Sequence, residues 1–160
     1  MQRSKPDVDD PGACKRRALD LLARRDHSRV ELERKLAARG FAPDQIGPTL
    51  EELEASGVLV ASRFTESFIR ARVARGKGPV RIRAELAQRG VAGEASELLR
   101  DPDVDWIAAA RAARAKRFGA EPPGDYDERA RQARFLYQRG FNREQIAAAL
   151  DFDVGDEAPE

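Results

Sequence analysis

The chain carries LAARGF at residues 36–41, LAQRGV at residues 86–91 and LYQRGF at residues 136–141. Each segment contains an Arg-Gly pair, and each glycine is fifty residues from the next. The first and third copies share further positions: Leu36, Arg39, Phe41, Gln45, Ile46 and Leu50 recur as Leu136, Arg139, Phe141, Gln145, Ile146 and Leu150. So many matches at one offset indicate an internally repeated unit.

The glycine of each segment predicts the end of a helix. Glycine adopts the left-handed backbone that follows a helix C-cap without a steric penalty. In that motif the residue after glycine packs on the side chain five positions earlier. These two positions are the first and last residues of each segment, and all of them are apolar. The arginine before each glycine would lie at the negative end of the helix dipole.

Capping patterns predict where helices begin. Residues 28–31, residues 142–145 and, more weakly, residues 125–128 have the spacing of a capping box. Pro43 and Pro102 suit the first position of a helix. Together with the apolar spacing, these signals predict three helices per unit. The expected helices cover residues 14–25, 28–39, 43–56, 62–75, 79–89, 93–100, 102–118, 125–139 and 142–150.

The predicted fold class is all-α, with three tandem three-helix repeats that form an elongated, curved helical array. In such an array each unit packs only against its neighbours, which suits a chain in which alanine supplies much of the apolar share. The expected units are residues 13–60, 61–100 and 101–151. They lie between a disordered N-terminal tail, residues 1–12, and an acidic disordered tail, residues 152–160.

Composition limits the possible classes of protein. Of the 160 residues, 41% are hydrophobic and 36% are charged, and the formal net charge is +1. A single cysteine, Cys14, excludes an internal disulfide. No apolar stretch approaches the roughly 20 residues that a membrane span needs, and the first residues lack the apolar core of a secretion signal. We therefore expect a cytoplasmic protein without membrane contact.

Candidates for catalysis are few. His27 stands directly before a predicted helix cap, where side chains usually face solvent. Residues 76–79, GKGP, form a short basic turn whose amides would suit a phosphate, although a plain turn between helices explains them as well. The sequence predicts neither an enzyme nor a protein that holds a cofactor or metal.

Basic residues gather in the second and third units. From residue 63 to residue 89 eight cations stand against two acids, and residues 106–118 add four cations without an acid. Such a stripe should attract nucleic acid or an acidic protein surface; the alternative is that these arginines only keep the chain in solution. The expected contact residues are Arg70, Arg72, Arg75, Lys77, Arg81, Arg83, Arg111, Arg114 and Arg117.

The order of these motifs resembles the RecX family, bacterial regulators of the RecA recombinase. The resemblance is carried by ALDLLARRDHSRVELERKLAARGF at residues 18–41, by LEELEASGVLVASRFTESFIRARVARGKGPVRIRAELAQRGV at residues 50–91, and by YQRGFNREQIAAAL at residues 137–150. It spans roughly residues 14–152. Family members usually have acidic residues before the Arg-Phe of the second segment, whereas this chain has VAS at residues 60–62, which leaves Ser62 as the candidate helix cap.

The resemblance implies a non-catalytic regulator of DNA repair, homologous recombination and the SOS response. It would bind in the groove of the RecA–DNA filament and modulate, most commonly inhibit, the recombinase, ATPase and coprotease activities of RecA. The implied partners are the RecA filament and single- or double-stranded DNA directly, and we expect a monomer. The alternative function is a sequence-nonspecific helical DNA-binding protein, because arginine-rich helices also favour phosphates.

Overall fold

A computed structural model describes residues 8–100 and 104–150, which form nine α-helices. The first unit consists of α1 (Ala13–Arg24), α2 (Arg29–Ala38) and α3 (Pro43–Ala55). The second consists of α4 (Ala61–Ala74), α5 (Pro79–Gln88) and α6 (Ala92–Leu98), and the third of α7 (Trp106–Phe118), α8 (Tyr126–Arg139) and α9 (Arg143–Ala149). The all-α prediction of three helices per unit is confirmed.

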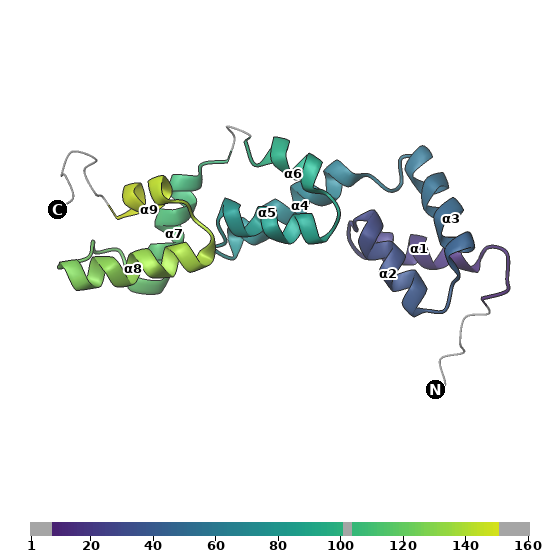
Figure 1. Cartoon of the computed structure of the whole chain (residues 1–160), viewed down its shortest axis with the longest axis horizontal. Coiled ribbons are helices and arrows are strands. Elements are labelled where there is room, and N and C mark those ends of the chain that lie inside the picture. Colours follow the sequence, from purple (N-terminus) through teal and green to yellow (C-terminus); the bar gives the residue numbers. More distant parts are fainter. Residues whose placement is uncertain (1–7, 101–103, 151–160) are drawn as a thin grey trace.

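Each unit has its own hydrophobic core. Residues such as Leu36 and Leu50 fill the first core, Ile82 and Leu86 the second, and Leu136 the third. Figure 1 shows the three groups of helices in a row, with the first and third units at opposite ends. This arrangement confirms an elongated array in which each unit buries its own apolar face and contacts only its neighbours.

The repeated glycines end α2, α5 and α8 as the sequence predicts. Their φ angles are 96° at Gly40, 75° at Gly90 and 96° at Gly140, all in the left-handed region. In each copy, the N–H that follows glycine donates to the carbonyl oxygen five residues earlier, at 3.2 Å. The two apolar side chains that flank each of these hydrogen bonds are buried. This is the hydrogen bonding of a Schellman motif.

Two predicted helix starts differ in the structure. Ser62 lies inside α4, which begins one residue earlier, and the N-cap position belongs to Val60, which offers no side-chain hydrogen bond. Ser62 is therefore not a cap. The first helix of the third unit begins at Trp106, where the Asp105 carboxylate accepts the N–H of Ala108 at 2.9 Å. The start predicted at residue 102 falls outside the described residues.

Part of the expected N-terminal tail is ordered. Val8 packs against the first core, and its carbonyl oxygen accepts a hydrogen bond from Gln45 Nε2 at 2.7 Å. The Val8 side chain also covers the turn at Gly40, where a Cβ atom would lie 3.5 Å from it. Disorder is thus the wrong prediction for residues 8–12. Residues 1–7 and 151–160 lie outside the described part of the chain.

The middle helices of the three units, α8, α5 and α2, follow one another along the row (Figure 1). Where α8 ends and α5 begins, the two backbones meet directly. The Gly78 N–H donates to the Arg139 carbonyl oxygen at 2.8 Å, and the Val80 N–H donates to the Gly140 carbonyl oxygen at 2.9 Å. A Cβ atom on Gly78 would lie 2.4 Å from the Gly140 carbonyl group. The GKGP segment is therefore a turn between helices, and the amide of its Gly78 bonds to the third unit.

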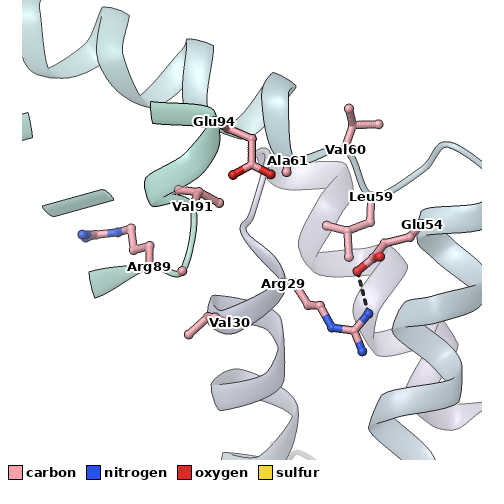
Figure 2. A pocket seen from close by; sticks show the side chains of 10 residues that line it. Arg29, Val30, Glu54, Leu59, Val60, Ala61, Arg89, Val91 and Glu94 are labelled. Carbon is pink, nitrogen blue, oxygen red and sulfur yellow. Dashed lines mark hydrogen bonds and ion pairs between the residues drawn. The ribbon is translucent and has the colours of Figure 1, made fainter. Parts of the chain in front are cut away.

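Side chains, rather than backbones, join the first two units. A Cβ atom on Gly90, at the end of α5, would lie 2.5 Å from Cγ2 of Val30 on α2. Arg89, the residue before that glycine, pairs with Glu31 across the junction at 3.0 Å. A hollow of about 420 Å³ lies beside this contact. Among its lining side chains, Arg29 of α2 pairs with Glu54 of α3 (Figure 2), and the pair is 2.7 Å long.

Candidate functional site

The second half of α4 presents an aromatic ring beside two cations. Phe68, Arg72 and Arg75 share one face because seven residues span about two helical turns. The Arg72 guanidinium lies 4.4 Å from the centre of the Phe68 ring, and its Nε donates to Glu85 at 2.7 Å. Arg89 lies 4.8 Å from the same ring centre. The ring thus holds two guanidinium groups in defined positions.

These side chains line a groove of about 330 Å³ between the first and second units. Four arginines and two acids contribute to it: Arg25, Arg72, Arg75, Arg89, Asp26 and Glu31. Glu31 is paired with Arg25 and with Arg89, each at 3.0 Å. The residues that line the groove therefore carry a net positive charge. Phe64 and Phe68 form its apolar wall.

A second basic cluster surrounds the α4–α5 turn. Burial and the neighbouring positive charges of Arg81 and Arg139 lower the pKa of Lys77 below its ordinary value, against the opposing effect of Glu85. Burial raises the pKa of Glu85, but the hydrogen bond and charge of Arg72 outweigh burial and lower this pKa overall. Arg81 also pairs with Glu85, at 3.5 Å, so the Glu85 carboxylate forms ion pairs with both Arg72 and Arg81.

Two predicted contact residues lie away from this cluster. Arg70 is two residues from both Phe68 and Arg72, so it points about 200° around α4 from their face. On α5, Arg83 is two residues from Arg81 and therefore also points about 200° away from it. Both side chains are exposed. The structure therefore brings together Arg72, Arg75, Lys77 and Arg81, and separates Arg70 and Arg83 from them.

The predicted cations of α7 have three different environments. Arg114 is only 8% exposed, and its guanidinium donates to the carbonyl oxygens of Glu121 and Ala120 and to Gln132 Oε1. It secures the α7–α8 loop and is not available to a partner, so its prediction as a contact is wrong. Arg111 donates to the Ala148 carbonyl oxygen at 3.2 Å, towards α9. Arg117 is exposed, beside Arg75 of the second unit.

Two cations near this surface were not among the predicted contacts. Arg139 comes from α8 and reaches the second unit, where its guanidinium donates to the Arg75 carbonyl oxygen at 3.4 Å. Lys116 lies in the same hollow as Arg139. Arg139 belongs to the third Arg-Gly pair. Its equivalent in the second pair, Arg89, also contacts the preceding unit, so the repeat could have indicated this role for Arg139.

His27 is buried, contrary to the prediction that it faces solvent. Only 2% of it is exposed, its Nδ1 lies 3.0 Å from the Arg25 carbonyl oxygen, and its Nε2 lies 3.0 Å from Lys35 Nζ. Burial, with the charges of Arg25 and Lys35, lowers the pKa of His27 below its ordinary value of 6.5. The imidazole is therefore neutral at pH 7 and accepts a hydrogen bond from the Lys35 ammonium group.

The described residues also bear on metal binding, thiol chemistry and membrane crossing. Residues 8–100 and 104–150 contain no group of three His, Cys, Asp or Glu side chains that could hold a metal ion. Cys14 is buried in the first core. None of the described helices combines the length and the apolar character that crossing a membrane requires.

Comparison with known proteins accounts for all three units. The family models of the first, second and third three-helix domains of RecX match residues 14–53, 62–97 and 103–150. The chain belongs to the RecX family. This membership confirms the resemblance that the sequence motifs indicate.

Curated relatives in this RecX family are similar over most of their length. The regulatory protein RecX of Halorhodospira halophila is 55% identical over 142 residues, which cover 88% of each chain. That of Pseudomonas entomophila is 46% identical over 144 residues, which cover 89% of this chain and 93% of the relative. These relatives are regulatory proteins, which supports a non-catalytic role for the family.

Solved structures of RecX share the fold. The crystal structure of RecX from Lactobacillus salivarius superposes with a TM-score of 0.73 at 21% sequence identity, covering 91% of this chain and 99% of that one. A second crystal structure of RecX gives a TM-score of 0.71 at 19% identity. The elongated three-unit architecture is therefore that of the family.

Proposed function

We propose that this RecX-family protein binds in the groove of the RecA–DNA filament and opposes the recombinase, ATPase and coprotease activities of RecA. The observation that carries the proposal is the positive surface on an elongated scaffold. Its cations come from α4, α5, α7 and α8, in two adjacent units. A RecA filament lies in the cytoplasm with the bacterial DNA, so the proposal also implies that location and a monomeric binder.

An elongated row of units suits a long partner. Separate units can contact successive parts of a filament at once, and several weak contacts on one scaffold add up to a high avidity. Arg72 and Arg81 are held by Glu85. Arg75, Lys77 and Arg117 have no acidic partner among the described residues. We place the central contacts at these three residues, supported by Arg72, Arg81 and Arg139.

Hydrolysis of ATP by RecA on single-stranded DNA provides the test. Wild-type protein, titrated at substoichiometric ratios, is expected to slow hydrolysis. The double variant Arg75→Glu/Lys77→Glu reverses two charges of the cluster and should lose most of this inhibition. The matched control, Arg70→Glu/Arg83→Glu, reverses two exposed charges on other faces and should inhibit like the wild type.

Helical circular dichroism of each variant checks that the chain is folded. Full inhibition by the folded Arg75→Glu/Lys77→Glu variant would refute the assigned contacts. Absence of any effect of the wild type on RecA would refute the function itself. Tight binding to DNA alone, with a steep salt dependence that RecA does not alter, would favour the alternative of a nonspecific DNA-binding protein.

A further inference from the structure

A small hollow lies between the second and third units, on the side where α4 ends. Its volume is about 220 Å³. The lining consists of four cations and three apolar or small residues: Arg75, Lys116, Arg117, Arg139, Gly76, Ala113 and Phe135. The four cations come from both units, and none of them forms an ion pair within the described part of the chain. The hollow thus carries an uncompensated positive charge.

An aromatic pair holds two of these cations in place. Phe118 and Phe135 meet edge to face, with ring centres 5.2 Å apart. Arg139 lies 4.9 Å from the centre of the Phe135 ring, and Arg117 lies 5.4 Å from the centre of the Phe118 ring. Stacking on a ring restricts a guanidinium group while its N–H groups stay free at the edge. The entropic cost of ordering these side chains around a ligand is correspondingly lower.

The backbone junction fixes the distance between the two walls. Main-chain hydrogen bonds from Gly78 and Val80 to the end of α8 hold the third unit against the second. The turn after α4 also lies close to α7, since a Cβ atom on Gly76 would be in van der Waals contact with Cβ of Ala113, at 3.4 Å. The positions of Arg75 and Arg139 on opposite sides of this junction therefore do not depend on flexible loops.

The shape and charge of the hollow select the chemistry of its ligand. It is far too small for a helix, which is about 10 Å wide with its side chains. A phosphate group offers several anionic oxygens to converging cations, and guanidinium groups bind it through paired hydrogen bonds. A single carboxylate offers only two oxygens. We propose that this hollow binds a phosphate group of a nucleic-acid backbone.

This inference deepens the proposed function, because a filament that contains DNA would present such phosphates to the protein. The test uses the full chain and a fluorescently labelled single-stranded oligonucleotide, without RecA, with anisotropy measured across a series of KCl concentrations. The variant Lys116→Gln/Arg117→Gln removes two cations of the hollow. The control Arg70→Gln/Arg83→Gln removes two exposed cations elsewhere.

Loss of two phosphate contacts should reduce the slope of log affinity against log salt by about 1.4, at about 0.7 for each contact on a single strand. The control should leave the slope unchanged. Equal effects of the two variants, or no effect of either, would overturn the site. Binding of inorganic diphosphate without displacement of the oligonucleotide, at constant ionic strength, would support phosphate chemistry but assign the hollow to a free ligand, against the nucleic-acid assignment.

Parallel measurement of RecA ATPase separates this site from the proposed function. If Lys116→Gln/Arg117→Gln binds DNA normally yet no longer inhibits RecA, the hollow contacts an acidic protein surface and the phosphate assignment is wrong. In that case the regulatory function stands. If the variant loses DNA binding while the wild type has no effect on RecA, the site stands and the proposed function fails.

Discussion

At the junction of the second and third units, main-chain groups meet, whereas at the junction of the first and second units only side chains do. Both contacts involve an Arg-Gly pair that ends a middle helix. At Gly140 the carbonyl oxygen accepts the Val80 N–H at 2.9 Å. At Gly90 the nearest atom of the neighbouring unit is a methyl group of Val30, and the polar contact is the Arg89–Glu31 ion pair.

This difference has consequences for rigidity. Hydrogen bonds between two backbones leave no side-chain torsion through which one unit can move against the other. An ion pair between long side chains tolerates movement and is screened by salt. We therefore expect the second and third units to behave as one block, and the angle of the first unit to respond to ionic strength.

The largest effect is expected from Gly78→Ala at the second junction. Gly78 has a φ of −94°, which alanine adopts freely, so the substitution acts only through the clash with the Gly140 carbonyl group. Two lost hydrogen bonds and overpacking should together destabilise the protein by about 3–5 kcal/mol. Hydrogen exchange should show that the Gly78 and Val80 amides lose protection, and urea unfolding gives the energy.

A matched control for this variant is Gly93→Ala. Gly93 lies in α6, and nothing would be within 4 Å of an added Cβ atom. Alanine there should be neutral or stabilise the helix by about 0.5–1 kcal/mol. If the amide of residue 78 in the Gly78→Ala variant is as protected from exchange as in the wild type, the backbone contact is not what joins these units.

The next largest loss of stability is expected from Gly90→Ala at the first junction. Alanine at this φ of 75° is strained, by about 1–2 kcal/mol, and its Cβ atom also meets Val30. Gly40→Ala carries similar backbone strain, but its nearest neighbour is 3.5 Å away. Urea unfolding should therefore show a greater loss for Gly90→Ala than for Gly40→Ala, by about 1 kcal/mol.

The double variant Val30→Ala/Gly90→Ala sharpens this prediction. The obstacle at the first junction is the Val30 side chain. Its truncation should therefore restore the part of the stability that Gly90→Ala loses through the clash, and a double-mutant cycle measures this part. Additive losses would mean that the two residues do not meet in solution. No corresponding rescue exists for Gly78→Ala, where the obstacle is a main-chain carbonyl group.

A smaller effect is expected from Glu31→Gln, which removes the pairs with Arg89 and Arg25. These partly exposed pairs should contribute about 1 kcal/mol at low salt and almost nothing near 1 M salt. Small-angle scattering should detect a broader distribution of distances between the first and second units in the variant. Glu33→Gln is the control, since Glu33 pairs with Arg29 inside α2, and it should leave the distribution unchanged.

The smallest effect is a pH dependence confined to the first unit. Because the pKa of His27 is lower in the folded chain than its ordinary value of 6.5, the unfolded chain binds the proton more readily. The contribution of His27 to stability is therefore present above pH 6.5 and is lost as the pH falls towards the folded-state pKa. Hydrogen exchange in α1 and α2 between about pH 7.5 and pH 5.5 should show this loss.

The variant His27→Gln provides the comparison for this measurement. Glutamine does not titrate, so exchange in α1 and α2 should lose its additional dependence on pH over this range. An equal pH dependence in the variant would assign the effect to other groups. Helices of the third unit should show no such dependence in either protein, because the hydrogen bonds of His27 go to Arg25 and Lys35 of the first unit.

Local features of the fold were predictable from sequence because their causes are local. The glycine turns follow from backbone sterics and a contact only five residues long, which is why all three ends were predicted correctly. Asn142 and Gln145 form a complete capping box, with both hydrogen bonds at 2.9 Å. Ser62 failed as a cap because Val60 already takes the N-cap position.

Long-range contacts were not predictable in the same way. Arg114 looks like its exposed neighbours in sequence, and only the position of Gln132 and the α7–α8 loop shows why it is buried. His27 is buried, with its Nε2 3.0 Å from Lys35 Nζ of α2, and a contact over eight residues is not visible in a local pattern. The close approach of Gly78 and Gly140 joins different repeats, so the fifty-residue period reveals the turn at Gly140 but not its contact with Gly78.

At Gly90 and Gly140 the glycine turn lies against a preceding unit, whereas among the described residues the turn at Gly40 has only Val8 beside it. The Val8 side chain covers it instead, held by the hydrogen bond from Gln45. Val8 therefore takes at this turn the place that a neighbouring unit takes at the other two turns.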